Sequence, residues 1–248
     1  MAYKLEVIGF SLEGCLIAQQ AGASRIELCD NPGDGGTTPS YGFIKAARKL
    51  LKIDLFIMIR PRGGDFIYSD EEFSIMKEDI KISKTLGCDG IVLGLLDEKG
   101  NIDKSKTSQL VEYAYPMGVT FHRAFDRVKN PFEALNDIID TGCERILTSG
   151  LQPTAIEGTG LLNELINHSN DLIIMPGSGI RSDNILKLAK ELNTFEFHTS
   201  ARMNRFSNQL PNINFNENLD PITTDETEIK KMKDALKGFY ESNKNNNL

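Results

Sequence analysis

The stretch Leu55-Phe-Ile-Met-Ile59, followed by Arg60-Pro-Arg-Gly-Gly-Asp-Phe66, decides the fold. Five consecutive apolar residues that end in a charged turn predict a strand buried on both faces, as in a parallel sheet. Arg60, Arg62 and Asp65 would then lie at the carboxyl end of that strand, where α/β proteins place their functional sites. The alternative is a surface turn whose arginines pair with neighbouring carboxylates. The rigid proline between the two arginines disfavours it.

The same strand pattern recurs along the chain, each time followed by helical periodicity. The predicted strands cover residues 4–9, 25–29, 54–60, 89–94, 119–123, 144–149, 172–176 and 195–199. Eight strand–helix units in 248 residues are typical of one α/β architecture, the single-domain (β/α)8 TIM barrel. A doubly wound open sheet is the runner-up, but neither a dinucleotide-binding glycine motif nor a P-loop follows any predicted strand.

The rest of the chain predicts a single domain that spans residues 1–248, because no linker-like composition interrupts residues 1–200. After the eighth strand, the Asn-rich stretch 203–225 lacks periodicity and predicts a long irregular loop. Residues 226–240 then predict a C-terminal helix. Two interpretations of the loop remain open, a cover over the barrel mouth and a disordered segment.

The composition narrows the class of partner. The chain has 28 basic and 35 acidic residues, a net charge of −7, which disfavours nucleic acid as a partner. The N-terminus shows no leader pattern and no apolar run reaches membrane-spanning length, so we expect a cytoplasmic protein without a membrane partner. Four scattered cysteines, at positions 15, 29, 88 and 143, fit reduced thiols better than a disulfide framework or a structural zinc site.

Titratable side chains recur within and after the predicted strands. Strands one, two and eight, which adjoin where a barrel closes, carry Glu6, Glu27, Glu196 and His198. Carboxylates buried in a barrel must be paired, hydrogen-bonded or bound to a ligand. A structural network is one reading, above all for the deeper Glu6. For acid–base chemistry, the candidate catalytic residues are Glu27, Asp65, His122, Asp126 and His198.

Arginines and small residues at the same strand ends predict a cradle for an anion. In this fold the loops after strands seven and eight frequently bind phosphate through backbone N–H groups. The candidate substrate-binding residues are Arg60, Arg62, Arg123, Ser149, Gly150, Gly177, Gly179, Ser200 and Arg202.

The same strand ends limit the chemistry. No lysine lies at the carboxyl end of a predicted strand, which counts against a Schiff-base mechanism and favours lyase or isomerase chemistry by proton transfer. A hard divalent ion is a further option. Its candidate ligands would be Glu27, His122, Glu196 and His198.

Seven motifs in order resemble the CutC family, usually named copper homeostasis proteins. They are Arg25-Ile-Glu-Leu-Cys29, Gly35-Gly-Thr-Thr-Pro-Ser40 and the segments 58–66, 120–126, 146–150, 174–180 and 196–202. The resemblance covers residues 4–202. It implies a cytoplasmic (β/α)8 barrel, often a homodimer, that is associated with copper tolerance or copper ion binding and has no established reaction.

The resemblance also implies a copper site. Many family members carry a cysteine where this chain has Ile8, and that thiol would partner Cys29. Cu(I) prefers soft thiolate and thioether ligands. With Ile8 in place of a thiol, the two-cysteine site is lost, which weakens the expected copper site and leaves Cys29 as the candidate metal ligand, with at best Met58 beside it. Two functions therefore stand: copper binding or trafficking in the cytosol, and an enzyme that acts on a small anionic metabolite, phosphorylated or carboxylated, at the barrel mouth.

Overall fold

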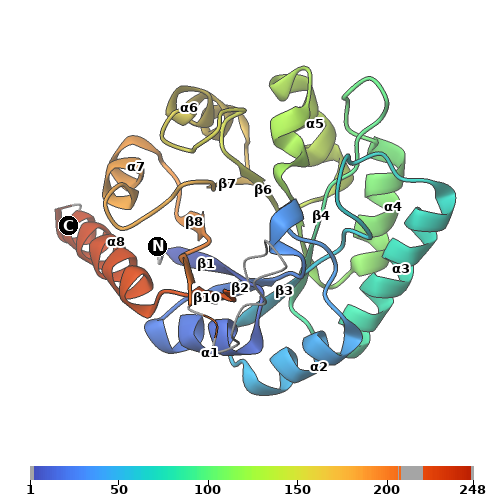
Figure 1. Cartoon of the computed structure of the whole chain (residues 1–248). Helices are drawn as coiled ribbons and strands as arrows, with labels where there is room; N and C mark the ends of the chain where they lie inside the picture. Colours follow the sequence, from blue (N-terminus) through green and yellow to red (C-terminus); the bar gives the residue numbers. More distant parts are fainter. Residues whose placement is uncertain (1–2, 206, 208–219, 247–248) are drawn as a thin grey trace, which may run out of the picture.

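The computed structural model describes residues 3–205, 207 and 220–246 of the chain. Eight parallel strands are hydrogen-bonded in the order β7-β6-β5-β4-β3-β2-β1-β8, and β7 and β8 contact each other across the remaining gap. The strands are β1 (Lys4–Gly9), β2 (Arg25–Leu28), β3 (Asp54–Met58), β4 (Gly90–Leu93), β5 (Gly118–Phe121), β6 (Arg145–Thr148), β7 (Ile173–Pro176) and β8 (Glu196–Thr199). The predicted TIM barrel is therefore confirmed, and the open sheet is excluded (Figure 1).

Helices surround the barrel, as Figure 1 shows. They are α1 (Leu12–Ala21), α2 (Tyr41–Leu50), α3 (Asp70–Thr85), α4 (Lys104–Ala114), α5 (Pro131–Thr141), α6 (Thr159–His168), α7 (Ile185–Glu191) and α8 (Glu226–Asn246), with the short 3₁₀ helices η1 (Pro32–Asp34) and η2 (Arg123–Arg127) at the mouth. Local sequence explains where they start. Ser69 begins α3 with a capping box, because its side chain accepts from the backbone of Glu72 while the Glu72 carboxylate accepts from the backbone of Ser69.

Two strands, β3 and β5, end two residues earlier than the sequence predicts because loop contacts replace the sheet. β3 stops at Met58, and the backbone N–H of Arg60 donates to Thr38 Oγ1 at 2.9 Å. β5 stops at Phe121, because His122 already caps η2 by accepting from the N–H of Ala124. Both changes place the charged residues beyond the strands, on the loops that form the mouth.

The register of the sheet decides which charged residues enter the barrel. Glu6 of β1 lies opposite Arg25 of β2 and His198 of β8. Residues opposite each other in a parallel sheet share a face, so these side chains gather inside the barrel. The Phe56 ring fills the adjacent interior, where a side chain at Gly90 would collide with it at 2.4 Å.

The segment after β8 is more ordered at its ends than the predicted irregular loop 203–225. Residues Arg202–Asn204 form β9 and Ile222–Thr224 form β10, which pair antiparallel. Positions 206 and 208–219 of that predicted loop lie outside the described residues. α8 starts as predicted and continues past residue 240, since no glycine or proline interrupts 241–246. In the described ranges, no helix has the length and apolar character needed to cross a membrane.

Candidate active site

A pocket of about 330 Å³ opens at the carboxyl ends of the barrel strands. Its walls come from seven of the eight strands or from the loops that follow them. The polar and charged lining residues are Glu27, Asp34, Arg60, His122, Arg123, Arg127, Ser178, His198, Ser200 and Arg202. The apolar lining residues and glycines are Ile8, Phe10, Pro32, Gly35, Met58, Phe66, Leu147 and Gly179. Predicted acid–base and anion-binding groups therefore meet in one cavity.

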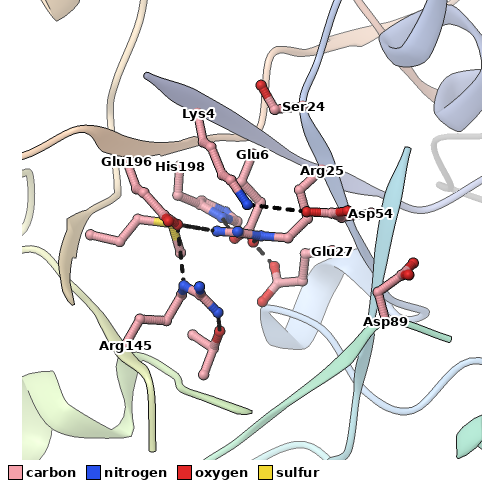
Figure 2. Close-up of polar contacts among 12 residues, drawn as sticks. Lys4, Glu6, Ser24, Arg25, Glu27, Asp54, Asp89, Arg145, Glu196 and His198 are labelled. Atoms are coloured by element: carbon pink, nitrogen blue, oxygen red, sulfur yellow. Dashed lines mark hydrogen bonds and ion pairs between the residues drawn. The ribbon is translucent and has the colours of Figure 1, made fainter. Parts of the chain in front are cut away.

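A buried ion network lies within the barrel (Figure 2). Arg25 pairs through Nε with Glu6 and through Nη2 with Glu196, at 2.6 Å for the second pair, and Arg145 Nε reaches Glu196 Oε2 at 3.1 Å. Burial opposes the charge on Glu6, yet Arg25 and His198 outweigh it and lower the pKa of Glu6 to about 2. Glu6 is therefore a structural anion, and Glu196 is paired with two arginines. This arrangement matches the structural network of buried carboxylates that the sequence analysis gave as one interpretation, above all for Glu6.

Glu27 differs from these two glutamates in its surroundings. Its side chain is buried and lines the pocket, and Oε1 has no hydrogen-bond partner among the described residues. Oε2 lies 3.8 Å from Nε2 of His198. Burial raises the pKa of Glu27 to about 7, with a further rise from the charge of Glu6. A carboxyl group that titrates near neutral pH is suited to general acid–base catalysis.

His122 presents a neutral imidazole to the same pocket. Burial and the charge of Arg60 lower the pKa of His122 to about 3. Nδ1 accepts a hydrogen bond from the backbone N–H of Ala124 at 3.2 Å, so the ring proton must be on Nε2. Nε2 is buried and has no partner in the described chain. His122 can therefore donate one hydrogen bond to a ligand oxygen.

Two of the predicted arginines line the pocket but also hold its loops in place. Arg60 is buried, and its guanidinium donates to the carbonyl oxygens of Asp34, Gly36 and Gly64 at 2.7, 2.9 and 2.8 Å. Arg123 binds the Asp126 carboxylate at 2.7 Å. Both guanidinium groups keep their charge at the pocket wall, but their donors are largely used by the protein.

Arg62 and Asp65 do not reach the pocket, which corrects their expected roles. Their side chains are 39% and 65% exposed and pair with each other at 3.0 Å. Arg62 also binds Glu72 of α3 at 2.6 Å. The turn at Gly64, where φ is +84°, reverses the chain and directs these side chains to the outer surface. For this pair the surface-turn alternative is correct.

Asp126 and Ser149 organise the loop after β6 and do not line the pocket. The Asp126 carboxylate is buried and accepts from the Thr148 hydroxyl and from the backbone N–H groups of Ser149 and Leu151. Ser149 Oγ accepts from Arg123 at 2.9 Å. The expected catalytic role of Asp126 is therefore replaced by a structural one, because every oxygen already has partners. Ser149 contacts the pocket lining through Arg123, and its hydroxyl also binds Asp126 and Gln152.

Two of the predicted glycines serve packing. A Cβ at Gly150 would lie 2.5 Å from the carbonyl oxygen of Gly158, and one at Gly177 would lie 2.5 Å from Leu147. The N–H of Gly177 is also used, since it donates to Thr148 O at 3.0 Å. Neither glycine lines the pocket, in contrast to Gly179, Ser200 and Arg202, which do so as expected.

The sequence analysis did not predict several residues that line the pocket. Arg127 ends η2 and reaches the pocket, although its only signal was a basic residue shortly after a predicted strand. Ser178 lines the pocket with φ at +80°, a conformation that strains a non-glycine residue and is typical of functional loops. Phe10 and Phe66 supply aromatic walls that resemble ordinary core residues in the sequence.

The candidate copper ligand does not find the partners that a copper site requires. The Cys29 side chain is fully buried, and burial raises the pKa of its thiol well above the ordinary value. It packs with Met58. Ile8, which stands where many family members carry a cysteine, packs against the same cluster. Within the described residues, no three His, Cys, Asp or Glu side chains are placed to hold a metal ion. These residues do not fit a copper site.

The divalent-ion option fails for a related reason. Glu196 is bound to two arginines, and His198 Nδ1 is bound to Glu6 at 2.7 Å. Two of the four expected ligands are therefore engaged elsewhere.

The barrel with acid–base groups and arginines at its carboxyl-end mouth defines the class of protein: a TIM barrel with a small-molecule pocket. The CutC family model matches residues 3–203. This chain belongs to the CutC family.

Similar proteins agree with that assignment. A CutC family protein of Chromobacterium violaceum is 51% identical over 199 residues, which cover 80% of this chain and 81% of the relative. The human copper homeostasis protein cutC homolog is 44% identical, with 83% of this chain and 76% of the human protein covered. A CutC crystal structure from Streptococcus agalactiae has a TM-score of 0.76 and 34% identity, covering 80% of this chain and 98% of that one. These names associate the family with copper homeostasis.

Proposed function

We propose that this chain is a cytoplasmic enzyme that binds a small anionic metabolite, phosphorylated or carboxylated, and transfers a proton on it. One observation carries the proposal. Oε1 of Glu27 and Nε2 of His122 are buried polar atoms, both without a partner in the described chain, and both residues line the same pocket. Buried polar atoms are normally satisfied, so a missing ligand is the simplest partner for both. One acceptor and one donor match a carbonyl compound with an acidic C–H group.

The charge of the pocket favours an anion. Arg60, Arg123, Arg127 and Arg202 line it, against the carboxyl groups of Glu27 and Asp34, although the whole chain carries a net charge of −7. Arg127 and Arg202 are exposed, and neither forms an ion pair within residues 3–205, 207 and 220–246. Guanidinium groups with free donors bind phosphate and carboxylate groups well. These two arginines are therefore the best candidates to recruit the ligand.

The chemistry follows from the protonation states. Ionised Glu27 takes a proton at Oε1 from a carbon next to the carbonyl, and the developing oxyanion accepts a hydrogen bond from Nε2–H of His122. Returning the proton to the neighbouring carbon gives an isomerase. Expelling a leaving group instead gives a lyase. No lysine lines the described pocket, so this route agrees better with the site than a Schiff-base mechanism does.

Anion binding is expected to raise the melting temperature by mass action. Inorganic phosphate and phosphorylated metabolites should stabilise the wild-type chain, because they bind only the folded pocket. In the double variant Arg127→Ala with Arg202→Ala the ligand-dependent part of the shift should be lost. Differential scanning fluorimetry at constant ionic strength measures it.

Arg62→Ala is the matched control, since Arg62 belongs to the same arginine-rich loop but lies outside the pocket. It should retain the full ligand-dependent shift. Equal shifts in all three proteins would count against an anion site at the mouth.

Copper ion binding is the second candidate, favoured by the names of the mouse and human relatives. The described residues support it less well, since Met58 is the only other sulfur-bearing side chain in the cluster that buries Cys29. We propose that any Cu(I) interaction of this chain is weak and does not depend on Cys29.

Cu(I) affinity should therefore be low in the wild type and nearly unchanged in Cys29→Ser. Ile8→Cys should raise it at least about tenfold, because Ile8 packs against the cluster that holds Cys29 and a second thiol would complete a soft pair. Anaerobic competition with a Cu(I) chelator gives the constants. Tight stoichiometric binding that disappears in Cys29→Ser would instead establish a thiol copper site.

A further inference from the structure

His198 lies between two buried glutamates that differ in protonation. Its Nδ1 is 2.7 Å from Oε1 of Glu6, and its Nε2 is 3.8 Å from Oε2 of Glu27. Figure 2 shows His198, Glu6, Glu27 and Arg25 close together inside the barrel. The side chains of His198, Glu6 and Glu27 are at least nine-tenths buried, and His198 and Glu27 also line the pocket.

Glu6 is the fixed end of this chain of contacts. Arg25 binds its Oε2, which leaves Oε1 for the imidazole. A carboxylate that a buried guanidinium keeps ionised can only accept hydrogen bonds, so Nδ1 of His198 must carry a proton. Nε2 therefore faces Glu27 with either a lone pair or a second proton.

Glu27 is the end that can change its protonation. Oε2 faces His198, whereas Oε1 has no partner in the described chain and belongs to a residue that lines the pocket. The other groups that act on this carboxyl are the charges of Glu6 and Arg25 and the Cys29 thiol, which acts on it as a side-chain hydrogen-bond partner. The 3.8 Å between Oε2 and Nε2 is longer than a hydrogen bond, so the side chains must first close to hydrogen-bond distance. When a proton on Oε2 then moves to Nε2, Glu27 becomes a carboxylate and His198 an imidazolium. The reverse step restores two neutral groups, so charge and protons balance.

We propose that Glu6 and His198 are positioning residues for Glu27: Glu6 holds the imidazole in the tautomer and orientation in which Nε2 exchanges a proton with Oε2 of Glu27. This inference rests on the proposed acid–base role of Glu27. The relay returns Glu27 to the carboxylate form in which it can act on the ligand at Oε1. Its geometry resembles the carboxylate–histidine pairs that orient catalytic imidazoles in other enzymes.

Nitrogen-15 NMR of the labelled imidazoles tests the relay directly. The full chain has only three histidines, so their ring signals can be assigned by substitution. In the wild type the neutral form of His198 should carry its proton on Nδ1. Burial opposes the charged imidazole, but Glu27 and Glu6 outweigh it and raise the pKa of His198. Glu27→Gln should therefore lower the titration midpoint of His198.

Glu6→Gln should lower the same midpoint and shift part of the neutral population to the tautomer protonated on Nε2. His168, an exposed residue of α6, is the internal control and should titrate alike in every variant. An unchanged midpoint in Glu27→Gln, or a wild-type His198 protonated on Nε2, would overturn the relay.

If Glu6→Gln does not fold, the wild-type tautomer and the Glu27→Gln titration still decide the question. The spectra need no ligand. An unchanged His198 midpoint together with intact phosphate-dependent stabilisation would therefore overturn the relay and leave the anion pocket standing. A shifted His198 midpoint without any phosphate-dependent stabilisation would support the relay and overturn the anion pocket.

Discussion

Arg25→Met should destabilise the folded chain by about 3–5 kcal/mol, because breaking a buried ion pair from one side leaves a buried charge without its partner. Arg25 is fully buried and pairs with both Glu6 and Glu196. Methionine preserves much of the side-chain length but supplies no charge. Urea unfolding at pH 7 measures the loss, with the slope of the transition checked to confirm that the denatured state is comparable.

The matched control is Arg62→Met, in which a partly exposed arginine loses two carboxylate partners at the surface. Solvent screening should limit that loss to about 1 kcal/mol or less. Adding Glu6→Gln to Arg25→Met should recover part of the buried loss, since the stranded carboxylate is removed. Equal losses in the two arginine variants would show that the barrel network contributes no more than a surface pair.

Glu27→Gln should make the protein more stable at pH 8. Folding raises the pKa of Glu27 from 4.5 to about 7, so the protonated side chain favours the folded state. This contribution to the free energy of unfolding is complete below about pH 4.5 and is lost as the pH rises through about 7. Above that range the wild type holds a buried carboxylate that a neutral amide would not. We expect a gain of about 1–3 kcal/mol at pH 8 and little difference near pH 5.

Urea unfolding at both pH values measures this difference, and Glu98→Gln, an exposed position, is the control. A residue whose removal stabilises the fold is retained for function rather than for stability. If Glu27→Gln were instead less stable at pH 8 than the wild type, the carboxylate would be a structural anion like Glu6.

The barrel and its inward-facing charges could be predicted from local pattern alone. Eight apolar runs separated by helical periodicity allow few other folds, and alternation along a strand gives Glu27 its inward direction. Closure of the barrel then brings β8 beside β1, so His198 lies near Glu6. These inferences depend only on strand geometry, which is regular.

The loops could not be predicted in the same way, because their directions depend on tertiary contacts. Nothing in the order of residues shows that the turn at Gly64 sends Arg62 outward while Arg60 stays inside. For the same reason Asp126 resembled a catalytic acid, although the neighbouring loop after β6 uses all of its acceptors. Arg127 was missed because a 3₁₀ turn, rather than a strand, carries it to the pocket.

Proton exchange in heavy water tests the central claim most directly. A panel of phosphorylated and carboxylated carbonyl compounds is incubated with the wild type in D₂O, and NMR follows deuterium uptake at the carbons next to the carbonyl group. We predict uptake in at least one compound, slowed by about 10²–10⁴-fold in Glu27→Gln, the range that a general base contributes. No uptake across the panel, or equal uptake in both proteins, would contradict the proposal that Glu27 moves a proton on an anionic metabolite.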